Sequence, residues 1–396
     1  MRLLHCADLH LDLAPDAPLA PDGSSLRMAD YVRAWEETTD LAVLHGVDAF
    51  VFCGDAFAVR RPSPIVLRAF AEPLRRLADK KAIPIVVVLG NHDALRLTSR
   101  DTAYDALKAA GLPLVIIDRV GLYRVETNSG PLEILGVPAP SARQWLEEGD
   151  LGRGDPMLIV AERIVKAMMA AAAEKCEGVR IIAGHLPIVG ARYGSERLLS
   201  VGDEIAISAL HLALSGVTYA ALGHIHECQQ VSAPLPAWYS GSLQSVDFSE
   251  EGQEKVALLV DIISQKVQVK PLPVWNRRLV TVKVEVPAEC DMPTVFVVGA
   301  IETAGIEDAI VRVIVSGPRS VASQLDMPAL QRALAPAFSV QGIKLDLEGE
   351  VRRRTEEAVE SMTPLDALRV YLADKVEEPK RRERLLRRAE TVMAEP

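Results

Sequence analysis

Polar residues that could ligate metal follow five short apolar stretches of the chain. They are Asp8 and His10, Asp55 after Gly54, Asn91 and His92 after Gly90, His185 after Gly184, and His224 and His226 after Gly223. Five of the eight histidines in the chain stand at these positions, and glycine precedes the polar residue in four of the five stretches. Glycine permits a sharp turn and a close approach of the backbone there. One such stretch could arise by chance, but five together indicate a functional cluster.

The chemistry of this set suits a pair of divalent cations. Apart from His92, it holds two carboxylates, one carboxamide and four imidazoles, with no cysteine, and such ligands fit a centre in which one carboxylate bridges two ions. Two ions about 3.5–4 Å apart can clamp a phosphate and generate hydroxide for in-line attack at neutral pH. The alternative interpretation is a group of unrelated turn and core residues, which the five-fold repetition disfavours.

The apolar stretches before these residues are typical of strands buried on both faces. They cover residues 3–6, 49–53, 83–89, 179–183 and 217–222, and a further one covers 114–117. Helical patterns lie between them at residues 25–45, 65–78, 158–176 and 203–214. This alternation predicts an α/β fold. Sites in open α/β sheets form outside the carboxyl ends of the strands, which is where the polar residues stand.

The chain changes character after about Pro273. Residues 279–286 and 309–315 alternate as strands do, and residues 329–337 have a helical pattern, which predicts a smaller α+β domain. From Thr355 onward the chain is charged and helical, and Thr363-Pro364 supplies a helix cap with proline at the first helical position. We therefore predict a main domain over 1–273, a second over 274–350 and C-terminal helices over 351–396.

Composition limits the classes of protein that the chain can represent. Its 396 residues, 49% hydrophobic, suffice for a large core and two or three compact units. No apolar run is long enough to span a membrane, and the N-terminus lacks a secretory pattern, so we expect a cytoplasmic protein. Five scattered cysteines without a C-x-x-C pair argue against a disulfide framework and a zinc finger. The net charge of −10 counts against nucleic-acid binding unless a local basic surface, a metal centre or a partner provides it.

In this order, the five stretches resemble the full motif set of the calcineurin-type metallophosphoesterases. More narrowly, the chain resembles the SbcD-type nucleases, the nuclease subunits of the bacterial SbcCD complex in DNA double-strand-break repair. The segments that carry this narrower likeness are LHCADLHL at 4–11, YSGSL at 239–243, DFSE at 247–250 and DAIVRV at 308–313. The resemblance implies a β-sandwich flanked by helices, a DNA-capping second domain and manganese as the metal.

Carried over by position, the resemblance implies two metal sites that share one ligand. The first would be held by Asp8, His10, Asp55 and His226, and the second by Asp55, Asn91, His185 and His224. Asp55 would be the bridge, and His92 would face the scissile phosphate to stabilise charge or protonate the leaving oxygen. One position departs from the family, which usually carries His or Asp three residues after the bridging carboxylate, where this chain has Ala58.

Two classes of function remain open at this point. The first is a DNA exo- and endonuclease that works with DNA and the SMC-like ATPase SbcC, as a homodimer within a heterotetramer. The second is a phosphoesterase for small nucleotides or phosphomonoesters, which needs the same metal ligands. The second domain and the C-terminal helices favour the nuclease, and a scaffold without metal is disfavoured because no ligand position is missing. The chain has no G-x-x-x-x-G-K-[ST] phosphate loop, so ATP dependence would come from a partner.

Several other residues receive structural interpretations. We predict that His5, His45 and His211 are packed or surface histidines rather than ligands, because they stand inside predicted strands and helices. Tyr31 and Trp35 have helical spacing and are predicted to lie in the core. The basic cluster over residues 380–388 is interpreted as a solvated helix face.

Overall fold

The computed structural model describes residues 1–12, 19, 25–81, 83–93, 102–150, 154–194 and 205–348, with residues 372, 382, 385, 386 and 388. The chain divides into two compact units. The first comprises Met1–Val282, Ala300–Val313 and Gln331–Gly342, and the second Lys283–Gly299, Ile314–Leu330 and Ile343–Pro396. The domain limits 1–273, 274–350 and 351–396 stay a prediction. Apart from the five isolated positions, the C-terminal helices and the basic cluster fall outside the described residues.

The first sheet carries three of the five ligand-bearing loops. Its strand order is β14-β13-β1-β2-β3-β4. The strands β1 (Arg2–Cys6), β2 (Ala49–Phe52), β3 (Ile85–Val88) and β4 (Leu114–Ile117) lie where strands were predicted, and they run parallel. The hairpin of β13 (Val256–Ile263) and β14 (Lys266–Pro273) extends the sheet beyond β1, with β13 antiparallel to β1. Our strand predictions did not include this hairpin.

The second sheet carries the other two loops. Its order is β11-β12-β10-β7-β6-β5. The strands β6 (Gly130–Val137), β7 (Val179–His185), β10 (Val217–Gly223) and β12 (Ala237–Tyr239) run parallel to one another. The edge strands β5 (Gly121–Thr127) and β11 (Gln229–Val231) are antiparallel to their neighbours. Among the four parallel strands, β7 and β10 are the two predicted ones.

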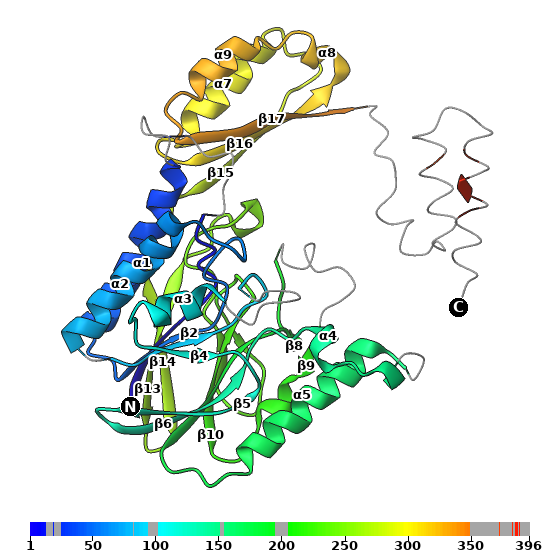
Figure 1. Ribbon diagram of the computed structural model, residues 1–396. Helices are drawn as coiled ribbons and strands as arrows, with labels where there is room; N and C mark the ends of the chain where they lie inside the picture. The colour runs from blue at the N-terminus through cyan, green and yellow to red at the C-terminus, as the bar shows by residue number, and fades with distance from the viewer. Residues whose placement is uncertain are drawn as a thin grey trace. The chain divides into compact units, whose positions relative to one another are not determined.

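Helices cover the outer face of each sheet, so the first unit is a β-sandwich flanked by helices (Figure 1). The elements α1 (Leu26–Leu44), α2 (Pro64–Lys81) and α3 (Ala103–Ala109) pack on the first sheet, and α5 (Pro156–Ala172) packs on the second. Consecutive residues of a strand face opposite sides: Phe50 and Phe52 point to the helices, and Val51 points to the other sheet. This alternation is why the strands read as continuous apolar runs.

Trp35 is the centre of the core under α1 and α2. It is fully buried, stacks on Phe70 with ring centroids 5.0 Å apart, and donates from its indole nitrogen to the Phe70 carbonyl oxygen. Tyr31 is buried beside it, which confirms the prediction that both aromatic residues lie in the core. Truncating a buried tryptophan typically costs about 3–5 kcal/mol, so this residue fixes the helices against the sheet whose strand ends carry the ligands.

The helix predicted over residues 203–214 is wrong in its described part, residues 205–214. This stretch holds β9 (Ile207–Ser208), which pairs with β8 (Ile188–Val189), and the short 3-10 helix η2 (Ala209–Leu212). Ile205, Ile207 and Ala209 are buried at every second position, which is the period of a strand. Short irregular helices also occur at α4 (Ala142–Trp145), η1 (Glu148–Asp150) and η3 (Phe248–Glu250).

The later part of the chain is α+β, as predicted. A three-stranded sheet has the order β15 (Leu279–Glu285), β16 (Ile310–Pro318), β17 (Ser339–Glu348). Three helices accompany it, α7 (Pro293–Thr303), α8 (Arg319–Ala322) and α9 (Met327–Ala333). The helix predicted at 329–337 corresponds to α9 but begins and ends earlier. Over the described residues, no helix is both long and apolar enough to cross a membrane.

Candidate metal centre

The structure brings all the predicted ligands to one edge of the sandwich, at the carboxyl ends of five strands. Asp8 and His10 follow β1, Asp55 follows β2, Asn91 and His92 follow β3, His185 is the last residue of β7, and His224 and His226 follow β10. Hydrogen bonds join these loops both within the first sheet and across the two sheets. The Asp8 amide donates to the Gly54 carbonyl oxygen at 2.9 Å, and the His224 amide donates to Asp8 Oδ2 at 2.9 Å.

A first group of donors is almost fully buried. Atoms of Asp8, His10 and His226 that could bind an ion lie within 4.8 Å of one another. His226 donates from Nδ1 to Glu250 at 2.9 Å, so its Nε2 carries a lone pair, and this Nε2 lies 3.1 Å from His10 Nε2. Nδ1 of His10 is buried without a hydrogen-bond partner among the described residues. Two ring nitrogens facing each other in this way fit a cation held between them.

A second group lies toward the open side of the edge. Asn91 Oδ1 is 2.9 Å from His185 Nε2 and 3.3 Å from His224 Nδ1. His185 donates from Nδ1 to the Cys53 carbonyl oxygen at 2.8 Å, so Nε2 is the nitrogen that carries the lone pair when the ring is neutral. Asn91 is exposed and His224 is partly exposed. This side of the cluster is therefore the one that solvent reaches.

Asp55 stands between the two groups. Its Oδ2 lies 3.9 Å from His10 Nε2 and 3.4 Å from His185 Nε2, while Oδ1 accepts a hydrogen bond from the His92 amide at 2.8 Å. The carboxylate is 2% exposed. One buried oxygen that faces nitrogens of both groups has the position that a bridging ligand requires.

His92 lies at the border between the buried group and the open side. Its Nδ1 donates to the carbonyl oxygen of Ala58 at 3.1 Å, and its ring meets that of His10 edge-on with centroids 5.0 Å apart. A ring nitrogen of His92 lies within 4.8 Å of donor atoms of His10 and Asp55. The side chain is therefore close to two of the proposed ligands, and its role beside the metal stays a proposal.

Comparison with known proteins identifies the family. Residues 1–228 match the model of the calcineurin-like phosphoesterases. The chain belongs to this family. Relatives named as the SbcD subunit of the nuclease SbcCD are 30% identical in Bacillus subtilis, over 66% of this chain and 66% of the relative, and 26% identical in Escherichia coli K12, over 68% and 66%. A Haloferax volcanii protein named DNA double-strand break repair protein Mre11 is 34% identical over 24% of this chain and 20% of its own.

The extent of these matches limits which properties of the relatives can be attributed to this phosphoesterase. The chain matches 66% of the length of the Bacillus subtilis and Escherichia coli proteins, so the activity, substrates and partners of those whole proteins are proposals for it. Among solved structures, the calcineurin-like phosphoesterase YfkN of Bacillus subtilis aligns with a TM-score of 0.38 and 12% identity, over 69% of this chain and 90% of its own. A likeness of that size adds nothing to the assignment.

The family and the donor set together establish the phosphoesterase as a binder of divalent metal. Burial raises the pKa of Asp8 to about 7, against the charges of His185 and His226, and lowers the pKa of His10 to about 3. Burial alone would lower the pKa of His185, but the Asp55 and Asp8 carboxylates outweigh it and raise that pKa to about 9. The metal-free cluster thus holds protons near neutral pH, which a bound cation would displace.

The backbone is bent at the ligands themselves. Asp8, His10, Asp55 and His224 have φ angles of 52°, 46°, 56° and 101°. Residues other than glycine seldom adopt positive φ, and each instance costs about 1 kcal/mol or more. Such strain persists only where the surrounding structure enforces it. Its concentration in four ligands is an independent sign, beyond residue type, that this edge is a functional site.

Glycines before the ligands allow the loops to touch. A Cβ on Gly90 would lie 2.0 Å from Asp55 Oδ1, and one on Gly223 would lie 2.0 Å from the Cys53 carbonyl oxygen. Gly54 has φ 92°, and a Cβ there would lie 2.4 Å from His185 Nδ1. The sequence pattern predicted close approach at these glycines, which the structure confirms at all three, and a sharp turn, which it shows by the positive φ of Gly54.

A second layer of polar residues orients the ligands, and our sequence reasoning assigned it no role. Glu250 accepts from His226 Nδ1 and also contacts Lys255 Nζ at 2.5 Å, with both side chains buried. Burial would raise the pKa of Glu250, but the hydrogen bond from His226 and the charge of Lys255 lower it to about 2. Asp93 accepts from the Asp55 amide at 2.8 Å. The only sequence signal was that Glu250 stands in the DFSE segment quoted for the family resemblance, and that Asp93 directly follows His92.

The remaining histidines are not in the cluster. His5 is buried and accepts from the Tyr219 hydroxyl, His45 caps the end of α1, and His211 is exposed on η2. All five cysteines are free, as predicted, although three of them are only partly buried.

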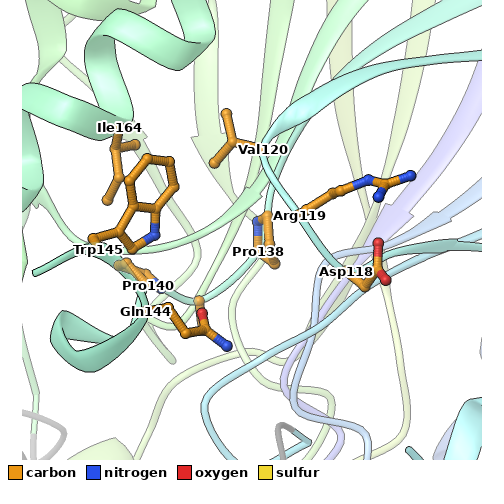
Figure 2. Close-up of a pocket in the computed structure, with 9 residues that line it drawn as sticks. Asp118, Arg119, Val120, Pro138, Pro140, Gln144, Trp145 and Ile164 are labelled. Atoms are coloured by element: carbon orange, nitrogen blue, oxygen red, sulfur yellow. The ribbon is translucent and has the colours of Figure 1, made fainter. Parts of the chain in front are cut away.

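A pocket of about 310 Å³ opens near the same edge, between the ends of β4 and β6. Figure 2 shows the Trp145 ring and Ile164 on one side of it, and Asp118 with Arg119 on the other. The wall of the pocket is tied to the ligand loop after β3, because the Ala139 amide donates to the Leu89 carbonyl oxygen at 2.8 Å. None of the predicted ligands lines it.

Proposed function

We propose that this phosphoesterase is a DNA nuclease, with exonuclease and endonuclease activity, that hydrolyses phosphodiester bonds at a two-metal centre. The observation that carries the proposal is the position of Asp55 Oδ2 between two groups of nitrogen and oxygen donors. Two divalent cations would supply an activated water and charge stabilisation at the phosphate. Mn²⁺ is the proposed ion, because imidazole and carboxylate ligands accommodate it and thiolates are absent from the set.

The proposed ligands divide as the geometry suggests. Asp8, His10 and His226 would hold one ion and Asn91, His185 and His224 the other, with Asp55 bound to both. Hydrogen bonds from His226 and His185 to Glu250 and the Cys53 carbonyl fix Nδ1 of each ring as the donor, so Nε2 is the proposed ligand atom. The protein thus enforces the tautomers in advance.

His92 is proposed to act on the phosphate rather than on the ions. Because its Nδ1 donates to the Ala58 carbonyl oxygen, Nε2 is the atom that can carry a further proton. Held there, the ring can stabilise charge on the phosphate or protonate the leaving oxygen, an effect of roughly 10²–10⁴-fold on rate. Ala58 provides this contact through its backbone, so the absence of a polar side chain at position 58 does not remove it.

DNA is the proposed substrate because of the relatives, which are named as nuclease subunits and a break-repair protein. An SMC-like ATPase of the SbcC type is the proposed partner, with this chain as a homodimer within a heterotetramer in the cytoplasm. The C-terminal segment from residue 351 is proposed to dock on that partner, and the domain over 274–350 to cap the DNA. The net charge of −10 makes the metal centre and local arginines the main attraction for the DNA.

The proposal is tested by offering three substrates side by side to the purified protein with Mn²⁺. Duplex DNA, hairpin DNA and bis(p-nitrophenyl) phosphate are compared, and an Asp55→Asn variant prepared in parallel controls for contaminating nucleases. We expect the wild-type protein to cleave both DNAs and the variant to cleave neither. Rapid turnover of the small ester with both DNAs untouched would instead support a phosphoesterase for small nucleotides.

A further inference from the structure

Arg60 lies on the segment that joins β2 to α2, at the open side of the metal centre. Its Nη2 donates to the backbone carbonyl oxygen of Asn91 at 3.3 Å. Two residues earlier, the Ala58 carbonyl oxygen accepts from His92 Nδ1 at 3.1 Å. The segment is therefore attached at two points to the loop that carries Asn91 and His92. The Arg60 guanidinium is thereby held beside His92, the residue proposed to face the reacting phosphate.

The charge of Arg60 has no counter-ion in the described part of the chain. No carboxylate there lies within 4.0 Å of it, and the contact with Asn91 is its only hydrogen bond to a described residue. Its Nε is buried without a hydrogen-bond partner among the residues that the structure describes, and the residue as a whole is half-buried. The planar guanidinium matches two oxygens of a phosphate. An arginine without a counter-ion, next to a site that gathers cations, is placed to receive an anion.

The direction of the Asn91 contact indicates which phosphate this would be. Asn91 turns its side-chain oxygen toward His185 and His224, whereas Arg60 meets its main-chain oxygen. Arg60 thus lies outside the donor group, on the outer side of the loop. We propose that Arg60 binds the phosphate that adjoins the scissile one and so holds the DNA strand in register with His92. This inference rests on the proposed nuclease function.

The test measures DNA binding without metal, so it does not depend on catalysis. Binding of a fluorescein-labelled oligothymidylate is followed by anisotropy in EDTA over a range of salt concentrations. The variants are Arg60→Gln and Arg60→Lys. The matched control is Arg75→Gln, because Arg75 Nη2 also donates to a backbone carbonyl, that of Ala110, before β4 and away from the ligand loops.

We expect Arg60→Gln to weaken binding about 10-fold, as for a charge-assisted contact, and to reduce the slope of log K against log salt by about 0.7. Arg60→Lys keeps the charge and should retain most of the salt dependence. It should retain only part of the affinity, since an ammonium group cannot contact two phosphate oxygens as the planar guanidinium does. Arg75→Gln should match the wild-type protein. Wild-type affinity and slope in Arg60→Gln would overturn the proposal. Loss of bound metal from that variant would overturn it too, because Arg60 would then support the ligand loop.

A second measurement separates this proposal from the nuclease assignment. If the wild-type protein binds DNA neither in EDTA nor with Mn²⁺, the proposed function fails, and the role of Arg60 is then tested by inhibition of bis(p-nitrophenyl) phosphate hydrolysis. The dinucleotide pdTpdT carries a phosphate beyond the one at the metals, and inorganic phosphate does not. A raised inhibition constant for pdTpdT alone in Arg60→Gln supports the assignment. Equal constants for pdTpdT in both proteins, or loss of ester hydrolysis with full metal content, would overturn it.

Discussion

Replacement of His5 by glutamine should make the stability of the protein less sensitive to acid. His5 lies fully buried in β1, three residues before Asp8. Its Nε2 donates to the Leu222 carbonyl oxygen at 3.1 Å, and its Nδ1 accepts from the Tyr219 hydroxyl at 2.9 Å. Each ring nitrogen of the neutral histidine therefore has a hydrogen-bond partner. Burial lowers its pKa from 6.5 to about 3.

The sign and size of the effect follow from this shift. Between pH 6.5 and 3 the unfolded chain protonates His5 and the folded chain does not, so stability falls as pH falls through that window. The slope approaches about 1.4 kcal/mol per pH unit, and the contribution lost between pH 7 and 4.5 is about 2.5 kcal/mol. Glutamine can make both hydrogen bonds without titrating. The His5→Gln variant should therefore lose about 2.5 kcal/mol less than wild type over this range.

Urea unfolding of the metal-free protein at the two pH values measures the difference. All four tryptophans, Trp35, Trp145, Trp238 and Trp275, belong to the first compact unit, so their fluorescence reports on the unit that contains His5. A change in packing would alter the free energy of unfolding equally at both pH values and would cancel in the difference between them. The His211→Gln variant, at an exposed position, controls for the removal of a histidine as such. An identical acid sensitivity in His5→Gln and wild type would refute the reasoning.

Four further predictions concern the site and its partner. The Asp55→Ala variant should lose more metal than His10→Ala, because Asp55 faces both donor groups; full occupancy in Asp55→Ala, by elemental analysis, would exclude a bridge. The His92→Ala variant should keep both ions and bind DNA but cleave it roughly 10²–10⁴-fold more slowly in a gel assay; near-normal cleavage would reassign the residue. The Glu250→Gln variant should weaken binding of one ion by about 10–100-fold in calorimetry, since Glu250 orients a ligand; unchanged affinity would contradict that role. Removal of the chain from Thr355 onward should spare nuclease activity and abolish co-purification with the ATPase, and a retained complex would exclude this segment as the docking element.

The strands that carry the ligands were predictable because they are buried on both faces and read as apolar runs. The hairpin β13–β14 was missed although β13 is itself apolar. Its turn residues Ser264 and Gln265 both have positive φ, at 47° and 66°, a conformation that Asn-Gly or Asp-Gly usually signals. The residues at this turn carry no such signal. The chain adopts the turn because β13 pairs with β1, a contact between residues more than 250 positions apart.

The cluster of proposed metal ligands was predictable from their residue types and their place after strands. Glu250 was not, because its role depends on a contact with His226 that only the folded chain creates. Arg60 likewise acquires its position through Asn91, on a different loop. Residue type and position after a strand can indicate which atoms bind an ion. They do not show which neighbours fix the orientation of those atoms.

The positive φ angles of Asp8, His10, Asp55 and His224 set function against stability at the same four positions. Glycine would adopt these angles without steric cost, so selection for folding alone would favour it there. Glycine, however, offers no ligand atom. Aspartate and histidine are among the other residues that tolerate positive φ best, so one choice of residue serves both the bend and the ion. In a copy released from catalysis, glycine should therefore accumulate at these four positions, because replacement by glycine removes strain as well as activity.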